Sequence, residues 1–324
     1  MQYPSIFSIK TPQRFQEAAL RTFQFQFEQV PVYRRFCELL GVKKQEVKDI
    51  DHIPFLPIEL FKSHRIHIAS EAPQIIFRSS GTTGSSPSEH LVTDISLYEE
   101  SFRTAFASFY GDPSQYTILA LLPSYLERGD SSLIYMVDHL IAASASEHSG
   151  FYLNDLSALI DKLEWLERQQ KPTILIGVSY ALLDLIEQKQ FQLQHTIVME
   201  TGGMKGRRKE LVRKELHALL KKGFGVTTIH SEYGMTELLS QAYSKGDGIF
   251  TTPPWMRVRT RETEDPFAYL TQKTGGINVI DLANQNSCAF IATQDLGRVY
   301  ENNSFEVLGR FDHSDVRGCN LMVM

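Results

Sequence analysis

The middle of the chain alternates between two apolar periodicities, and this alternation limits the folds that it can adopt. Residues 155–170 read DLSALIDKLEWLERQQ, with apolar side chains at helical spacing. Residues 173–180, TILIGVSY, form an apolar run of strand length; residues 181–190 have a helical pattern, and residues 195–203, HTIVMETGG, form a second apolar run. A strand, a helix and a second strand in this order predict a βαβ unit with two buried parallel strands. We therefore expect an α/β protein with mainly parallel βαβ layers.

Two further segments extend this pattern. Residues 208–223, RKELVRKELHALLKKG, predict a helix that ends at Gly223 as its C-cap, and residues 225–234, GVTTIHSEYG, predict a third strand. Four apolar side chains of the helix are expected to be buried: Val212, Leu216, Leu219 and Leu220.

The pattern changes toward both ends of the chain. The N-terminal part is mostly helical until Pro54 and Pro57 interrupt it, whereas after about Gly246 the helical signal fades and Gly, Thr, Asn and Pro become more frequent. We expect three parts: a helical segment over residues 1–70 packed on the main domain, an α/β core over residues 71–245, and a β-rich subdomain over residues 246–324 that ends in the segment GRFDHSD.

Composition excludes several classes of protein. The 324 residues carry a formal net charge of -5 and a pI near 6.1, whereas nucleic-acid binders are usually strongly basic, so we expect no nucleic-acid partner. The N-terminus has no secretory leader pattern, and no apolar run reaches bilayer length, so we expect a cytoplasmic protein without a membrane span. Three scattered cysteines provide neither a disulfide framework nor a paired zinc motif.

A loop of small polar residues follows a short apolar run. Residues 79–86 read SSGTTGSS and follow the strand-like QIIFR. Backbone N–H groups and hydroxyls in such a loop can bind an anion, with phosphate as the natural ligand, because glycines let the main chain approach closely. The loop lacks the lysine of a Walker A motif and does not match GxGxxG, so a solvated turn is the alternative interpretation. The candidate binding residues are Ser79, Ser80, Gly81, Thr82, Thr83 and Gly84.

A second motif, SEYGMTE, follows the third predicted strand. Tyr233 and Gly234 are candidates to cover a planar base, Thr236 can donate to a phosphate, and Glu237 can ligate the magnesium ion that accompanies nucleoside triphosphates. The alternative is structural: Tyr233 is then a half-buried packing residue, and Glu237 is a helix N-terminal residue favoured by the helix dipole.

Together, SSGTTG and, about 150 residues later, YGMTE resemble motifs of the adenylate-forming superfamily, which includes acyl-CoA ligases, luciferases and adenylation domains. The resemblance implies the N-terminal domain fold of that superfamily, use of ATP with Mg²⁺, and a nucleotide and acyl site in the 71–245 core. By the same resemblance Asp295 in TQDLG holds the ribose hydroxyls, and Arg310 in GRFDHSD lies near the nucleotide. Gly202 and Gly203 match the family's adenine-side glycines.

The elements IPFLPIELFKSHRI, TGGMKGRR and GRFDHSDVRGC are most similar to the LuxE-type acyl-protein synthetases. That resemblance implies activation of a carboxylic acid, by analogy a fatty acid, as acyl-AMP, followed by transfer to Cys319 and then to a partner protein such as a reductase subunit or an acyl carrier protein. Arg317 and Gly318 precede Cys319 and suit a reactive thiolate. Two alternatives stay open: a ligase that uses coenzyme A or a carrier-protein thiol, and a non-catalytic nucleotide-binding scaffold.

The chain also departs from the superfamily pattern. It ends five residues after Cys319, so we expect no separate C-terminal lid domain and no lid lysine. The glycine-rich loop lacks the lysine that often follows SGTTG, and we expect Arg78 or Lys205 to help stabilise the phosphates.

Other polar residues have weaker claims to a role. His230, at the start of the SEYG strand, is a candidate to face the acyl pocket or the nucleotide, while Cys37 and Cys288 lie in apolar surroundings typical of structural residues. A basic run is either a solvated helix face or a docking surface for an acidic partner. It comprises Lys205, Arg207, Arg208, Lys209, Arg213, Lys214, Lys221 and Lys222.

Overall fold

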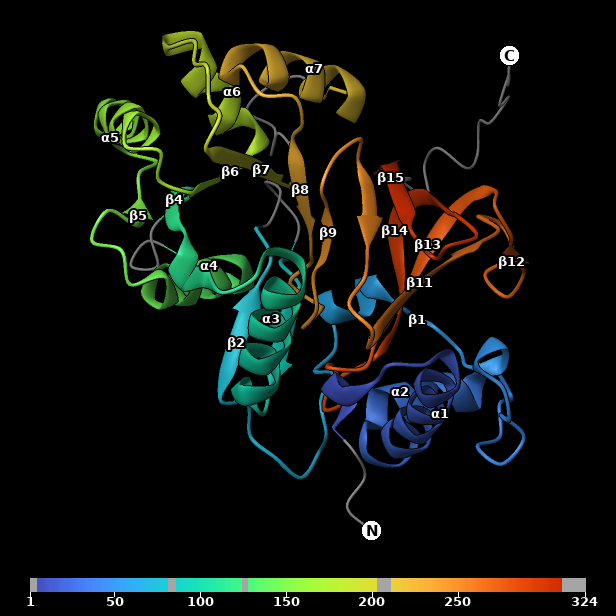
Figure 1. Ribbon diagram of the computed structural model, residues 1–324. Helices are drawn as coiled ribbons and strands as arrows, with labels where there is room; N and C mark the ends of the chain where they lie inside the picture. Colours follow the sequence, from blue (N-terminus) through green and yellow to red (C-terminus); the bar gives the residue numbers. More distant parts are fainter. Residues whose placement is uncertain (1–4, 81–85, 124–127, 203–210, 311–324) are drawn as a thin grey trace.

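The computed structural model describes residues 5–80, 86–123, 128–202 and 211–310. One large mixed sheet forms its centre, with strands in the order β12-β11-β13-β14-β15-β10-β9-β8-β7-β6-β4-β5 (Figure 1). The expected α/β class is confirmed, because helices cover this sheet and the half formed by strands within residues 117–233 is parallel.

The parallel half contains the predicted βαβ unit. Strand β6 (Thr173–Val178), helix α6 (Ser179–Gln188) and strand β7 (Thr196–Thr201) follow one another, and β6 pairs with β7 in parallel. All six residues of β6 are buried, as expected for a strand covered on both faces. The other parallel strands are β4 (Thr117–Leu121), β5 (Gly150–Phe151) and β8 (His230–Tyr233).

Helices lie on both faces of this half. Helices α3 (Ile95–Tyr110) and α4 (Ser132–Ser144) lie on one side of the strands, and α6 and α7 (Arg213–Phe224) lie together on the other (Figure 1). Helix α5 (Leu156–Arg168) precedes β6 and buries Leu159, Leu163 and Leu166, which are residues of its predicted apolar face.

Helix α7 differs from its sequence prediction. It begins at Arg213, so Val212 is its N-cap residue and is 62% exposed, and Leu219 lies on the outer face at 47% exposure. The other two predicted residues, Leu216 and Leu220, are buried as expected, and Phe224 extends their buried stripe. The C-cap is Gly225, which has a φ of 66°, rather than Gly223, which lies against α6 where an added Cβ would be 2.6 Å from the Cβ of Ile186.

The second half of the sheet is antiparallel and comes from the C-terminal part of the chain. It continues from β8 through β9 (Ala242–Ser244) and β10 (Ile249–Thr251) without a break. The remaining strands are β11 (Met256–Arg261), β12 (Tyr269–Leu270), β13 (Thr274–Asp281), β14 (Phe290–Val299) and β15 (Phe305–Arg310).

The N-terminal segment packs against the antiparallel half (Figure 1). Gln26 of α1 is fully buried, and its amide nitrogen donates to the carbonyl oxygens of Asn284 and Gln285 at 2.9 Å each. Short strand β1 (Leu56–Pro57) pairs with β14, and β2 (Ile75–Arg78) forms a separate two-stranded sheet with β3 (Glu89–Val92). The N-terminal helices and short 3₁₀ segments are η1 (Ile6–Ser8), α1 (Pro12–Gln29), α2 (Pro31–Leu39), η2 (Ile50–His52) and η3 (Ile58–Lys62), and a further 3₁₀ segment, η4 (Pro113–Gln115), lies between α3 and β4.

The described residues lack two features that would indicate a membrane or metal-binding role. None of the helices combines the length and the apolarity needed to cross a membrane. Within the same described ranges, no group of three or more His, Cys, Asp or Glu side chains is arranged to hold a metal ion.

Candidate functional site

Three polar side chains from distant segments meet where β8 and β15 end beside the middle of β14. The Tyr233 hydroxyl donates to Oδ2 of Asp295 at 2.9 Å, and Nε of Arg310 donates to Oδ1 of the same carboxylate at 3.1 Å. Asp295 is 5% exposed, whereas the Arg310 side chain is largely exposed. The cluster therefore presents a cation at the surface above a buried carboxylate whose two oxygens are both engaged.

A bulge between β14 and β15 shapes the strand around Asp295. The register shifts between Leu296 and Gly297, and an added Cβ at Gly297 would lie 2.3 Å from the carbonyl oxygen of Glu306. Glycine is required at this close approach of two backbones. The TQDLG motif thus includes a glycine that the packing of β14 against β15 demands.

Tyr233 is more deeply buried than the structural alternative predicts. It is 8% exposed, and its ring centroid lies 5.4 Å from that of Phe305 and 5.8 Å from that of Phe250. Burial raises the pKa of Tyr233 well above its usual range, and the neighbouring Asp295 carboxylate adds to this effect. The phenol therefore keeps its proton and remains a hydrogen-bond donor to Asp295.

Glu237 lies in a turn after β8, so the idea that it begins a helix is wrong. It is 6% exposed, and burial raises the pKa of this carboxyl, while a hydrogen bond from Ser88 and the positive charges of Arg310 and Lys62 oppose the rise. The side-chain amide of Asn284 fixes the backbone of this turn by donating to the Glu237 carbonyl oxygen at 2.8 Å.

The turn is also held at Thr236. Nδ1 of His90 lies 2.8 Å from the carbonyl oxygen of Thr236, and Nε2 of the same ring lies 3.0 Å from Oδ1 of Asn284. His90 is on β3, which leads out of the Ser/Gly/Thr-rich loop. The buried side chains of His90 and Asn284 therefore connect the strand that follows the Ser/Gly/Thr-rich loop to the turn that contains Thr236.

The base of the Ser/Gly/Thr-rich loop is closed by two serines. Ser79 and Ser88 bond through their backbones at 3.1 Å, and the Ser79 hydroxyl accepts a hydrogen bond from the Ser88 N–H at 2.9 Å. Ser80 is exposed and follows Ser79. Because Ser88 also bonds to Glu237, the loop emerges beside the YGMTE turn. The loop residues Gly81, Thr82, Thr83 and Gly84 lie outside the described residues.

Gly202 lies at the exit of β7, one position past the Thr201–Glu232 pair of the sheet. Its φ of 67° favours glycine, and its carbonyl oxygen accepts a hydrogen bond from the Ser179 hydroxyl at 2.6 Å. This places Gly202 beside the strand that carries Tyr233. Gly203 lies outside the described residues.

His230 lies at the opposite end of β8 from Tyr233, and the structure does not bring it into the cluster. Nδ1 of its ring is 3.1 Å from the Tyr110 hydroxyl, and burial lowers the pKa of His230 to about 4, with the charge of Lys245 lowering it further. The ring is therefore neutral near pH 7. It lies three strand positions before Tyr233, a distance of roughly 10 Å.

The cysteines and the basic run have different environments. Cys37 and Cys288 are fully buried; burial raises the pKa of Cys37 to about 12 and raises that of Cys288 further, as expected for inert thiols. Cys319 lies outside the described residues, as does Lys205.

Within the basic run, Arg213 does not join a solvated face, because its Nη1 lies 2.7 Å from Oε1 of the buried Glu200.

Sequence reasoning missed Lys62, which contributes positive charge at Glu237. Lys62 ends the short η3 segment, and the preceding Phe61 packs edge-on against His90 with ring centroids 5.8 Å apart. The segment IPFLPIELFK carried the family resemblance, but nothing in its pattern assigns the lysine a place near YGMTE. Arg78, which was expected to assist, instead pairs with Glu89 at 2.9 Å.

No protein-family model matches the chain. Among curated proteins, it is 23% identical over 321 residues to a long-chain-fatty-acid–luciferin-component ligase of Vibrio harveyi, covering 92% of this chain and 84% of the relative. A protein of the same name from Aliivibrio fischeri is 22% identical, with 99% of this chain and 91% of the relative covered.

Solved structures share the fold. A 2-hydroxyisobutyryl-CoA ligase in the postadenylation state, in complex with 2-HIB-AMP, superposes with a TM-score of 0.67 at 11% identity, covering 96% of this chain and 72% of that one. ATP-bound MatB from Rhodopseudomonas palustris gives a TM-score of 0.53 at 19% identity, covering 72% of this chain but only 47% of MatB. The likeness expected from the motifs thus extends to nearly the whole chain in both sequence and fold.

Proposed function

Because the chain is a LuxE-type adenylate-forming protein, we propose that it activates a fatty acid with ATP as acyl-AMP and then transfers the acyl group to a thiol. The names of the curated relatives supply the acid class, a long-chain fatty acid. The observation that carries the proposal is the junction of Ser88 with Glu237, which joins the Ser/Gly/Thr-rich loop to the YGMTE turn beside Asp295 and Arg310.

In this proposal each part of the site has one task toward ATP. The backbone N–H groups and hydroxyls of the loop from Ser79 to Gly84 bind the phosphates, together with Thr236. Asp295 accepts hydrogen bonds from the ribose hydroxyls, while Tyr233 holds its carboxylate in place. Gly202, Gly203 and Gly234 line the base, and Arg310 adds positive charge.

The donor set at Glu237 suits Mg²⁺. This ion is usually bound through one or two carboxylates together with substrate phosphates and water, so one buried carboxylate beside a phosphate loop is a sufficient protein contribution. Bound there, Mg²⁺ would neutralise charge on the phosphates of ATP. Glu237 would hold it, and the Ser88 hydroxyl would orient the carboxylate.

The first chemical step needs positioning more than a base, because a fatty acid is already ionised at neutral pH. A carboxylate oxygen of the acid attacks the α-phosphorus, the bond to the β-phosphate oxygen breaks, and pyrophosphate leaves with the electron pair. Arg310 and Lys62 are the described cations that would stabilise the developing charge.

In the second step a thiolate attacks the carbonyl carbon of acyl-AMP and AMP leaves, giving a thioester. We assign the thiolate to Cys319. From there the acyl group would pass to an acceptor protein, such as a reductase subunit or an acyl carrier protein, or to coenzyme A.

Intact-protein mass spectrometry tests both steps. Wild type is incubated with ATP, Mg²⁺ and a panel of fatty acids, beside Cys319→Ser and, as a matched control, Cys37→Ala. We expect an ATP-dependent mass gain of one acyl group in wild type and in Cys37→Ala but none in Cys319→Ser. Acyl-AMP without any protein adduct would assign the thiol to coenzyme A or a carrier, and release of no AMP with any acid would refute the adenylation itself.

A further inference from the structure

His90 is a fully buried histidine beside the YGMTE turn. Nδ1 of its ring lies 2.8 Å from the Thr236 carbonyl oxygen, and Phe61 packs edge-on against the ring. Burying a polar ring costs free energy unless the ring is hydrogen-bonded, so the folded protein maintains the contact with Thr236. Thr236 and its neighbour Glu237 are two of the residues that we assign to ATP and Mg²⁺.

The start of β3 contacts this turn at two alternate positions. The Ser88 side chain bonds to the Glu237 carboxyl, and the His90 ring contacts the Thr236 carbonyl oxygen. Glu89 lies between them and forms an ion pair with an arginine of β2 instead. Alternate residues of an extended segment point to the same side. The segment that leads out of the Ser/Gly/Thr-rich loop therefore holds the turn both at a side chain and at the main chain.

The rest of the turn is held by residues that follow β13. The side-chain amide of Asn284 donates to the Glu237 carbonyl oxygen at 2.8 Å. The Asp281 carboxylate accepts hydrogen bonds from the N–H groups of Leu239 and Ser240 at 2.7 and 2.9 Å. These three hydrogen bonds do not involve the His90 ring. A change of that ring should therefore free the carbonyl group before Glu237 while leaving residues 237–240 in place.

A planar peptide group transmits the contact from Thr236 to Glu237. The Thr236 C=O and the Glu237 N–H belong to the same peptide group, which is trans, so they point in opposite directions. The Glu237 carboxyl accepts a hydrogen bond from this N–H and another from Ser88. The direction of the Thr236 carbonyl group therefore decides whether the Glu237 N–H reaches its own carboxyl.

Building on the proposed function, we propose that His90 is a positioning residue for Mg²⁺ and ATP, which orients the Glu237 carboxylate through the Thr236–Glu237 peptide group. With the carbonyl oxygen held by the ring, the N–H and the Ser88 hydroxyl fix the carboxylate from two sides. Hydrogen-bond partners of a metal-ligating side chain contribute about tenfold or more to metal affinity. The role rests on Glu237 as the Mg²⁺ ligand.

The ring has the proton that this role requires. Burial lowers the pKa of His90 to about 4, while its contacts with Thr236 and Asn284 oppose this effect, so the ring is neutral near pH 7. A neutral imidazole has one N–H. The Nδ1 contact with Thr236, at 2.8 Å, is shorter than the Nε2 contact with Oδ1 of Asn284, at 3.0 Å, so we assign the proton to Nδ1. The Nε2 side then contributes packing.

Calorimetric titration of ATP at several Mg²⁺ concentrations tests this role without any measure of turnover. His90→Leu removes the N–H, so the Mg²⁺ concentration that gives half-maximal ATP binding should rise about tenfold. Binding of AMP without metal should not change, because AMP needs no oriented Glu237 carboxylate. An equal loss of ATP and AMP binding would indicate a generally distorted site and would overturn the proposal.

Two conservative variants locate the essential contact on the ring. Asparagine places its side-chain nitrogen near the position of Nδ1, whereas glutamine places it near that of Nε2. His90→Asn should therefore restore the Mg²⁺ dependence of wild type, and His90→Gln should behave as His90→Leu does. Restoration by Gln and not by Asn would place the contact at Asn284 and would contradict the proposal.

A double variant tests whether His90 acts through Glu237. Glu237→Gln alone has already lost the carboxylate that is to be oriented, so adding His90→Leu to it should shift the Mg²⁺ dependence no further. Additive shifts would mean that the two residues act independently, and the proposed route through the peptide group would then be wrong.

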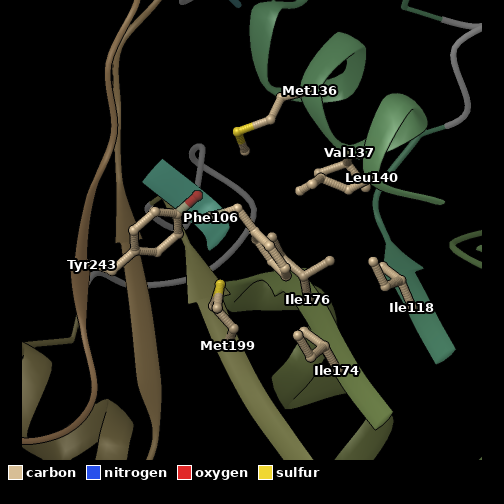
Figure 2. A pocket seen from close by; sticks show the side chains of 9 residues that line it. All are labelled: Phe106, Ile118, Met136, Val137, Leu140, Ile174, Ile176, Met199 and Tyr243. Carbon is tan, nitrogen blue, oxygen red and sulfur yellow. The ribbon is translucent and has the colours of Figure 1, made fainter. Parts of the chain in front are cut away.

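His139→Leu is the matched control. His139 is a half-buried histidine of α4 whose Nδ1 lies 2.9 Å from the Tyr135 carbonyl oxygen, so the change removes the same kind of contact. Figure 2 shows Val137 and Leu140 of this helix among the residues that line a small cavity of about 10 Å³ against the sheet, and the control leaves this packing in place. Its Mg²⁺ dependence should equal that of wild type.

The tautomer of His90 provides a test on wild type alone, which remains decisive where a variant folds poorly. Nitrogen NMR spectra of the histidine side chains distinguish the two ring nitrogens, and we expect the proton of His90 on Nδ1. A proton on Nε2 alone would overturn the proposal. Unaltered Mg²⁺ dependence in His90→Leu would overturn this inference and leave the proposed function intact, whereas a wild type that binds no ATP at any Mg²⁺ concentration would overturn both.

Discussion

Tyr233 donates its hydroxyl hydrogen to Asp295 at 2.9 Å, although strands β9, β10 and β15 separate their two strands in the sheet. The bond links the end of the parallel half to the antiparallel half at the point where Arg310 also contacts Asp295. A motif tyrosine and a motif aspartate, 62 residues apart in sequence, therefore act as one unit, and a change in either should affect the other.

The first prediction concerns Asp295→Ala. This change removes the proposed acceptor for the ribose hydroxyls and leaves the buried Tyr233 hydroxyl without a partner. We expect the KM for ATP to rise about tenfold or more and the free energy of unfolding to fall by about 1–3 kcal/mol. Pyrophosphate exchange and urea unfolding measure the two effects.

Asp265→Ala is the control for this prediction, because Asp265 is exposed and its side chain accepts a turn hydrogen bond from the Phe267 N–H at 3.0 Å. An Asp295→Ala protein that is less stable but binds ATP as wild type does would assign Asp295 a purely structural role.

The second prediction concerns Glu237→Gln. The amide keeps the shape of the side chain but loses the charge that a hard cation requires. The Mg²⁺ concentration that gives half-maximal binding of ATP should rise about tenfold or more, whereas binding of AMP without metal should not change. Calorimetric titrations of ATP at several Mg²⁺ concentrations measure this. An unaltered Mg²⁺ dependence would count against Glu237 as the ligand.

Sequence periodicity predicted β6, α6 and β7 because each has a strong local signal: an apolar run of strand length or a spaced apolar face. Helix α7 shows where such reasoning fails. Val212 and Leu219 match an apolar pattern but lie on the exposed side, since the position of the buried stripe depends on contacts with α6 that the sequence of α7 alone does not specify.

The candidate site was predictable only as separate motifs. The meeting of Ser88 with Glu237, and of Tyr233 with Asp295, depends on pairing between strands far apart in the chain. Lys62 carries no local signal, because its place beside Glu237 follows from the packing of Phe61 on His90. The buried pair of Glu232 and Thr201 was also missed, since a glutamate in a strand shows its significance only when its partners are known.

The third prediction concerns Lys62→Ala. If Lys62 stabilises the phosphates as proposed, its loss should lower the rate of acid-dependent pyrophosphate exchange about tenfold or more. Stability should change little, because the side chain is exposed. Lys48→Ala, which removes another exposed lysine, should behave as wild type. Equal rates for the two variants would exclude Lys62 from the site.

The fourth prediction concerns the pH dependence of stability and the buried carboxyl of Glu232. Burial raises the pKa of Glu232 in the folded protein to about 7, from an ordinary value of 4.5, despite a hydrogen bond from Thr201. Below pH 4.5 the carboxyl is protonated in both states, so its contribution to stability is fully present. As the pH rises toward 7 the unfolded chain ionises first, and this contribution is lost.

Glu232→Gln should therefore gain stability relative to wild type as the pH rises. The difference in the free energy of unfolding between variant and wild type should grow by about 3 kcal/mol between pH 4.5 and pH 8, and then remain constant. Urea unfolding at closely spaced pH values measures it, and subtraction cancels the groups that titrate equally in both proteins. Glu71→Gln, at an exposed position, should show no such trend. A constant difference across this range would mean that Glu232 is ionised in the folded protein, and this would contradict the raised pKa.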